Sequence, residues 1–144
     1  MKAVVHSRYG SPDGLEIRDL PTPDPAAGEV LVRVRASSVH PDVWHVVTGR
    51  PAVLRLMGAG VRRPRSPVPG TDLAGEVHET GPGVDRFRPG DPVFGEIVRT
   101  IQWRNAGAWA EFAAVPADLL APKPAALTFE EAGAIPTSAL IALR

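Results

Sequence analysis

The chain has 144 residues, with 16 acidic and 16 basic side chains and no cysteine. This length predicts one domain with a hydrophobic core, and the balanced charge argues against nucleic acid or an anionic membrane surface as a partner. Without cysteine, neither a disulfide nor a thiolate metal site can form within the chain, and no apolar stretch reaches the length of a membrane span or a secretory signal, so we expect a cytoplasmic protein.

Turn-forming residues are distributed along the whole chain. Its 16 prolines and 14 glycines are not pooled in one tract. This spacing is typical of many short strands joined by turns, and it predicts a mainly β fold with a few short helices. The first two strands are expected at residues 2–7 and 15–20, across a turn that contains Pro-Asp-Gly.

Residues 28–39 give the clearest strand pattern, because apolar and polar residues alternate along them. The alternation predicts a half-buried strand with one face made of Val30, Val32 and Val34 and the other of Leu31, Arg33 and Arg35. Directly after this strand, Pro41 can open a short helix over residues 42–48 that Gly49 ends. Residues 50–67 are expected to be irregular apart from the apolar stretch at residues 52–57, and they could form a flap over a cleft.

Further strands are predicted at residues 70–81 and 90–98, separated by a glycine- and proline-rich turn. Residues 108–116 alternate again, and we expect them to close a β-barrel. Near the C-terminus, Thr128 and Glu131 have the spacing of a capping box, which predicts a helix that Pro136 interrupts. Residues 137–144 begin a second apolar helix without a terminal cap, so we expect a longer natural polypeptide. A short C-terminal helix that docks on its own barrel is the alternative.

Six sequence blocks occur in an order that resembles a known family. They read "MKAVV", "GEVLVRVRASSVHP", "PVPGTDLAGEV", "GPGVDRFRPGDPVFG", "GAWAEFAAVP" and "LAPKPAALTFEEAGAIP". Together they resemble the N-terminal, GroES-like catalytic domain of the medium-chain dehydrogenase/reductase superfamily, and within it the zinc-independent quinone oxidoreductase branch. The resemblance implies that residues 1–144 form a distorted, partly open β-barrel. It also implies a separate Rossmann domain that binds NADPH or NADH, and the glycine-rich turn of such a domain does not occur in this chain.

The resemblance also bears on metal binding. Zinc-dependent relatives place a cysteine ligand after the long strand and a histidine-glutamate pair at the start of the next strand. In this chain His40 occupies the first position, and Thr71 and Asp72 occupy the other two. Zinc requires a tetrahedral set of sulfur, imidazole or carboxylate ligands, and the sequence offers no third ligand. We therefore expect no metal site.

Zinc-independent relatives usually have asparagine where this chain has His40, and an aspartate three residues later, where this chain has Val43. Asp42 lies one position early. An imidazole can still donate a hydrogen bond to a substrate carbonyl oxygen or supply a proton during hydride transfer. The candidate catalytic residues are therefore His40, Asp42 and Asp72. The alternative for His40 is that it caps the turn and bonds a backbone carbonyl.

Other residues are candidates for binding the substrate or the cofactor. Trp44 would share one side of a helix with His40 and could wall an apolar pocket, or it could pack in the core. Thr71 could face a substrate cleft, or make a structural hydrogen bond to the loop at residues 40–44. Trp103 could lie at the cleft rim or in an exposed loop. By resemblance, Thr137 and Ile141 fall in the region that touches the nicotinamide.

The sequence thus predicts the substrate side of an NAD(P)H-dependent oxidoreductase that reduces a quinone, an enone or a carbonyl compound. Residues 1–144 alone should be inactive and should not bind the cofactor tightly, and the complete enzyme could be a homodimer. A stand-alone GroES-like binding module without redox activity is the main alternative. A relative of the co-chaperonins is a second alternative, but residues 50–67 are a poor match for the apolar recognition loop of those proteins.

Overall fold

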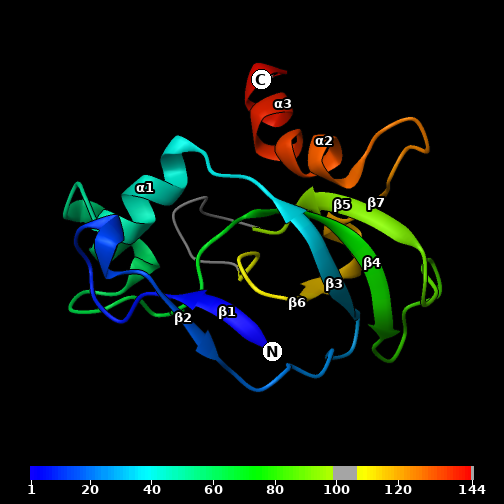
Figure 1. Cartoon of the computed structure of the whole chain (residues 1–144), viewed down its shortest axis with the longest axis horizontal. Coiled ribbons are helices and arrows are strands. Elements are labelled where there is room, and N and C mark those ends of the chain that lie inside the picture. The colour runs from blue at the N-terminus through cyan, green and yellow to red at the C-terminus, as the bar shows by residue number, and fades with distance from the viewer. Residues whose placement is uncertain (99–106, 144) are drawn as a thin grey trace.

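The computed structural model describes residues 1–98 and 107–143, which form two antiparallel sheets and short helices (Figure 1). The smaller sheet pairs β1 (Lys2–Val5) with β2 (Glu16–Asp19). The larger sheet has the order β6-β3-β4-β5-β7. Its strands are β3 (Glu29–Ser37), β4 (Asp72–Thr80), β5 (Pro92–Glu96), β6 (Phe112–Pro116) and β7 (Ala121–Pro122).

The two sheets meet at one short junction. Ala3 and Ala110 form an isolated bridge, flanked by hydrogen bonds from the Val4 amide to the Trp109 carbonyl and from the Glu111 amide to the Lys2 carbonyl (2.8 and 3.0 Å). The segment predicted to close the barrel therefore contacts both sheets: its end is strand β6, paired with β3, and its start touches β1. The sheets do not join into a closed cylinder, which confirms the predicted partly open barrel.

Alternation along the strands builds the core, because successive side chains point to opposite faces. Val30 and Val32 of β3 lie in one buried apolar cluster with Leu73 and Val93 of the neighbouring strands. The prediction for Leu31 was wrong: it shares the alternation of Arg33 and Arg35, yet it is buried. Since Val30, Leu31 and Val32 are all buried, both faces of β3 are covered at this point.

Strands β3 and β4 approach so closely at one point that only glycine fits. An ideal Cβ on Gly75 would lie 2.2 Å from the carbonyl oxygen of Arg33 on the paired strand. Gly75 is paired with Val34 next to a register irregularity between Val34 and Ala36. Such bulges bend and twist a strand, and a residue without a side chain allows the close contact.

Three short α-helices follow the sequence signals closely. Helix α1 (Pro41–Thr48) begins with Pro41 and ends at Gly49, whose φ of 63° is the left-handed conformation typical of helix ends. Helix α2 (Phe129–Ala134) has the predicted capping box: Thr128 Oγ1 accepts from the Glu131 amide, and the Glu131 carboxylate accepts from the Thr128 amide. Helix α3 (Pro136–Ala142) starts at Pro136. Figure 1 shows α2 and α3 together beside one end of the large sheet, and Gly133 of α2 lies against Ala36 of β3.

Three further short segments form single helical turns of the 3₁₀ or π type. Pro12–Gly14 and Ala117–Leu119 form 3₁₀ turns, η1 and η3, and Arg55–Ala59 forms a π-helical turn, η2. Turn η2 overlaps the apolar stretch at residues 52–57 that was set apart from the expected irregular segment, but the sequence did not predict a π-helical turn there. Within the described ranges, no helix has the length and apolar character needed to cross a membrane.

Candidate active site

His40 lies between β3 and α1, and its ring bonds a side chain on the neighbouring strand. The residue is the N-cap of α1 with extended backbone angles (φ −125°, ψ 168°), and its side chain makes no capping hydrogen bond. Instead, His40 Nε2 lies 2.6 Å from Thr71 Oγ1, a short hydrogen bond between the end of β3 and the start of β4. The structure thus contains the bond between Thr71 and the loop at residues 40–44 that the sequence offered as an alternative.

The second ring nitrogen of His40 faces a carboxylate. His40 Nδ1 is buried and has no hydrogen-bond partner among the residues that the structure describes, while Asp42 Oδ2 lies 3.7 Å away. This separation is too long for a hydrogen bond, but a small movement of Asp42 in the first turn of α1 would close it. With the ring proton on Nδ1, beside this carboxylate, Nε2 accepts from Thr71; with a proton on Nε2, the ring donates to Thr71 and can donate to another oxygen in its place.

Asp72 forms a buried polar cluster with helix α3. Its carboxylate accepts hydrogen bonds from Ser38 Oγ (2.8 Å), Thr137 Oγ1 (2.5 Å) and the Thr137 amide (3.3 Å). Asp72 and Thr137 are each only 1% exposed. Because a buried charge is tolerated only with such partners, these bonds hold α3 against the start of β4.

Ser37, Ser38 and Trp109 belong to the same cluster and were not singled out from the sequence. Ser37 Oγ donates to the Asp72 carbonyl at 2.6 Å, and Trp109 Nε1 donates to the Ser38 carbonyl at 3.1 Å. The signal for the serines was the polar pair at the end of an apolar strand, directly before His40. Trp109 had no such signal, because residues 108–116 read only as an alternating strand.

The structure therefore brings together five of the predicted site residues and leaves others apart. His40, Asp42 and Thr71 are connected on one side, and Asp72 and Thr137 on the other. Trp44 is 50% exposed and its ring meets His45 edge-on, which excludes the alternative that it packs in the core. Ile141 is 55% exposed on α3. Trp103 lies outside the described residues.

The donor set around His40 does not resemble a zinc site. Residues 1–98 and 107–143 contain no group of three histidine, cysteine, aspartate or glutamate side chains placed to share a metal ion. His40 and Thr71, at two of the ligand positions of zinc-dependent relatives, bond each other directly. At the third position, the Asp72 carboxylate already accepts hydrogen bonds from Ser38 and Thr137. A neutral hydroxyl and an engaged carboxylate do not supply the ligands that zinc prefers.

The order Asp42, His40, Thr71 is that of a carboxylate, an imidazole and a hydroxyl, which in other settings activates a nucleophile. Here the hydroxyl is unsuited to attack a substrate, because Thr71 is 1% exposed. The arrangement can instead orient the imidazole of His40, whose two ring nitrogens can take up and release a proton. The geometry therefore favours hydrogen bonding and proton transfer by His40 over covalent catalysis by Thr71.

Comparisons with known proteins agree with this architecture. Residues 26–125 match the family model described as the alcohol dehydrogenase GroES-like domain. The chain is 34% identical over 143 residues to a chloroplastic quinone-oxidoreductase homolog of Spinacia oleracea, which covers 99% of this chain and 40% of that protein. The quinone oxidoreductase structure from Coxiella burnetii superimposes with a TM-score of 0.83 at 29% identity, covering 99% of this chain and 43% of that one.

A further solved structure contains a cofactor. The Escherichia coli quinone oxidoreductase complexed with NADPH has a TM-score of 0.74 at 26% identity, and the similarity covers 92% of this chain and 36% of that one. In each of these comparisons the chain spans about two fifths of the relative's length.

Proposed function

The chain belongs to the family of alcohol dehydrogenase GroES-like domains, and on that premise we propose that it is the substrate-side domain of a zinc-independent NAD(P)H-dependent oxidoreductase. The acceptor is a quinone, an enone or another carbonyl compound. A cofactor-binding domain, supplied by further polypeptide, completes the enzyme. The observation that carries the proposal is the direct bond between His40 and Thr71, because it engages two of the positions at which zinc-dependent relatives have metal ligands.

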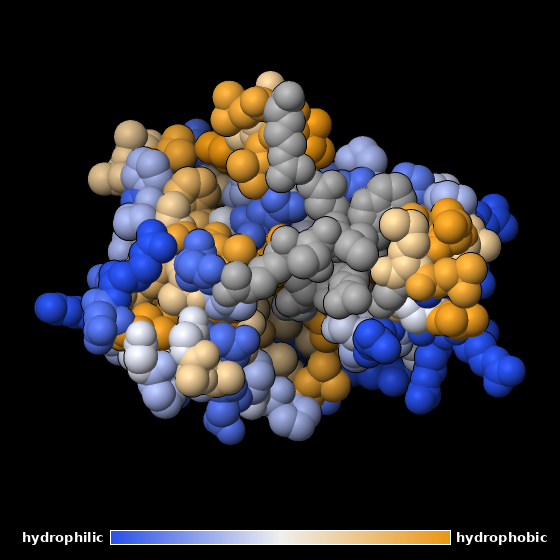
Figure 2. Space-filling view, turned by 180° about the vertical axis from the view of Figure 1, so that it is seen from behind, coloured by the Kyte–Doolittle hydropathy of each residue, from blue (hydrophilic) through white to orange (hydrophobic). Residues whose placement is uncertain are grey.

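An exposed apolar strip on α3 and its C-cap residue Leu143 supports the need for a neighbouring domain. Leu140, Ile141 and Leu143 are 40%, 55% and 84% exposed. Figure 2 shows apolar side chains gathered at the top of the molecule, where α3 lies. Adjacent exposed apolar residues of this kind often mark an interaction surface. The strip is joined to the His40 region through the bonds between Thr137 and Asp72, so a domain docked on α3 would be held at a fixed place relative to the site.

The cofactor contributes the hydride, and the residues of this chain position the acceptor and manage the proton. As the carbon of the acceptor receives the hydride, negative charge develops on its oxygen, and a hydrogen-bond donor beside that oxygen lowers the barrier. We assign this role to His40, which exchanges its bond with Thr71 for one to the acceptor oxygen. Asp42, 3.7 Å from Nδ1, stabilises the ring when it carries the additional proton.

The two predicted cofactor contacts have different environments. Thr137 uses both its hydroxyl and its amide to bond Asp72 and is 1% exposed, which supports a role in anchoring α3. Ile141 is exposed on the same helix and remains available for an apolar contact with the cofactor. Of the two, Ile141 therefore fits direct contact with the nicotinamide and Thr137 fits a structural role.

The proposal is tested by measuring NADH and NADPH oxidation with 1,4-benzoquinone, 2-cyclohexen-1-one and an aldehyde. A polypeptide that joins residues 1–144 to a cofactor-binding domain should turn over at least one acceptor, and activity should persist after dialysis against a chelator. Residues 1–144 alone should show no turnover and no saturable NADPH binding by calorimetry. Loss of activity on chelation, or tight NADPH binding by residues 1–144, would contradict the corresponding part of the proposal.

A further inference from the structure

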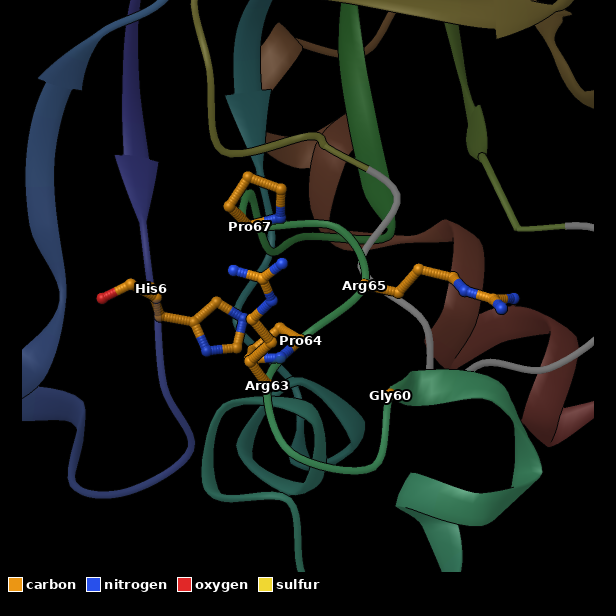
Figure 3. A pocket seen from close by; sticks show the side chains of 7 residues that line it. His6, Gly60, Arg63, Pro64, Arg65 and Pro67 are labelled. Carbon is orange, nitrogen blue, oxygen red and sulfur yellow. The ribbon is translucent and has the colours of Figure 1, made fainter.

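A hollow lies on the side of the molecule where β1 ends, apart from the candidate active site. Its volume is about 480 Å³, and it is lined by His6, Ser7, Gly60, Arg63, Pro64, Arg65 and Pro67. Figure 3 shows the His6 ring and the Arg63 side chain reaching into this hollow from opposite sides, whereas the Arg65 side chain extends away from it. None of the seven lining residues is acidic.

The arginines around this hollow differ from others in the chain. Arg18 and Arg35 form ion pairs with Glu16 and Glu76 at 2.6 and 2.8 Å. For Arg62, Arg63 and Arg65, no ion pair is described within residues 1–98 and 107–143. Three cationic side chains within four residues, without a matching carboxylate, leave a local excess of positive charge on a chain whose formal net charge is zero.

The backbone that carries these arginines is held in place at several points. The His6 amide donates to the Pro67 carbonyl and the Arg65 amide donates to the Ala59 carbonyl, both at 2.9 Å. Gly60 has a φ of 112°, and a Cβ at this position would lie 2.2 Å from the Arg63 carbonyl oxygen, so the turn closes tightly on itself. A binding loop that is already ordered loses less entropy when it binds a ligand.

From this geometry we infer that the hollow between His6 and Arg63 binds the phosphate group of a small molecule. The guanidinium of Arg63 presents parallel N–H donors that match two oxygens of one phosphate. Ser7 adds a hydroxyl at the rim, and Arg62 and Arg65 add attraction at longer range. The phosphate can come from a simple phosphate ester or from a nucleotide, since both present the same oxygens to Arg63.

The test is calorimetric titration of residues 1–144 with inorganic pyrophosphate, at low and at physiological salt. Arg63→Gln should weaken binding about tenfold or more, as expected for the loss of a charged hydrogen-bonding partner. Arg18→Gln is the matched control, because it removes the same charge from an exposed arginine on β2 and should leave the affinity unchanged. The ring resonances of His6 should shift in the wild-type chain on titration and should not shift in the Arg63→Gln variant.

Three outcomes decide the inference. Equal weakening by both substitutions would show that pyrophosphate is attracted by the overall charge of the chain and not by Arg63, which would overturn the inference. Absence of saturable pyrophosphate binding would also exclude the site. Displacement of pyrophosphate by AMP and not by glycerol 3-phosphate would support the site with a nucleotide as the phosphate source, whereas displacement by glycerol 3-phosphate would support a simple phosphate ester. Because these measurements use no acceptor and no turnover, their failure is separate from failure of the proposed oxidoreductase function.

Discussion

Thr137 and Asp72 are 65 residues apart in the sequence, and the threonine hydroxyl donates to the buried carboxylate at 2.5 Å. This bond ties the last helix to the first residue of β4. The same carboxylate accepts from Ser38 at the end of β3. One side chain therefore fixes the relative positions of three segments around the candidate active site.

Asp72→Asn should lower the free energy of unfolding by about 2 to 4 kcal/mol, because an amide cannot accept from all three donors and leaves at least one of them buried without a partner. Urea unfolding measures the loss. Asp19→Asn provides the control, since the Asp19 side chain is 79% exposed and its only described ion pair, to Lys2, is 3.5 Å long. It should change stability by less than about 0.5 kcal/mol. Equal effects of the two substitutions would show that the buried cluster does not stabilise the fold.

Gly75→Ala should destabilise the large sheet, because its new Cβ would fall 2.2 Å from the Arg33 carbonyl oxygen and push β3 and β4 apart. We expect a loss of about 2 to 3 kcal/mol, the usual cost of overpacking. Gly14→Ala is the matched control: its Cβ would meet no atom within 4 Å, and its backbone conformation does not require glycine. That substitution should be neutral within about 0.5 kcal/mol. Thermal unfolding of both variants distinguishes steric conflict from a general effect of losing glycine.

Much of the fold follows from local sequence signals. The alternation of β3, the ends of α1 at Pro41 and Gly49, and the capping box of Thr128 each depend on residues close together in the chain, so the sequence alone predicts them. The burial of Leu31 was missed because it depends on what covers the second face of β3, which the strand's own alternation does not reveal. The π-helical turn at Arg55–Ala59 has no comparable local pattern.

The site was only partly predictable, because some of its contacts join segments that are far apart in the sequence. The sequence singled out His40, Thr71 and Asp72 because polar residues interrupt apolar strands there. It did not reveal that the Thr137 hydroxyl and amide both donate hydrogen bonds to Asp72, because this contact exists only once α3 has folded back onto β4. The sequence left open whether Trp44 walls a pocket or packs in the core, because helical spacing fixes only the side of α1 on which it lies. The structure leaves it half exposed, which excludes core packing.

Tyr9 should make stability depend on pH in the alkaline range. Burial raises the pKa of Tyr9 above its ordinary value of 10.0, while the positive charge of Arg55 opposes this shift. A pKa that is higher in the folded state means that the stabilising contribution is complete below about pH 10 and is lost as the pH rises through the folded pKa. Tyr9→Phe should remove this dependence, together with the hydrogen bond from Tyr9 to the Gly60 carbonyl.

The measurement is direct because Tyr9 is the only tyrosine in the chain. Its ionisation can be followed by ultraviolet absorption in the folded protein and in urea, and the folded midpoint should lie at the higher pH. Urea unfolding of the wild type and of Tyr9→Phe across the same pH range then gives the linked change in stability. A folded midpoint at or below the midpoint in urea would contradict the prediction.

The proposed function depends most on His40 as the hydrogen-bond donor to the acceptor oxygen. The most direct test is kcat/KM for NAD(P)H-dependent reduction by a polypeptide that joins residues 1–144 to a cofactor-binding domain. His40→Ala should lower kcat/KM about 100-fold, the scale expected for losing a donor at a developing negative charge. His40→Asn should stay within about tenfold of wild type, because an amide can donate the same bond, and His78→Ala, at an exposed position on β4, should have no effect. If His40→Ala were as active as His78→Ala in a folded protein, the proposed role of His40 would be wrong.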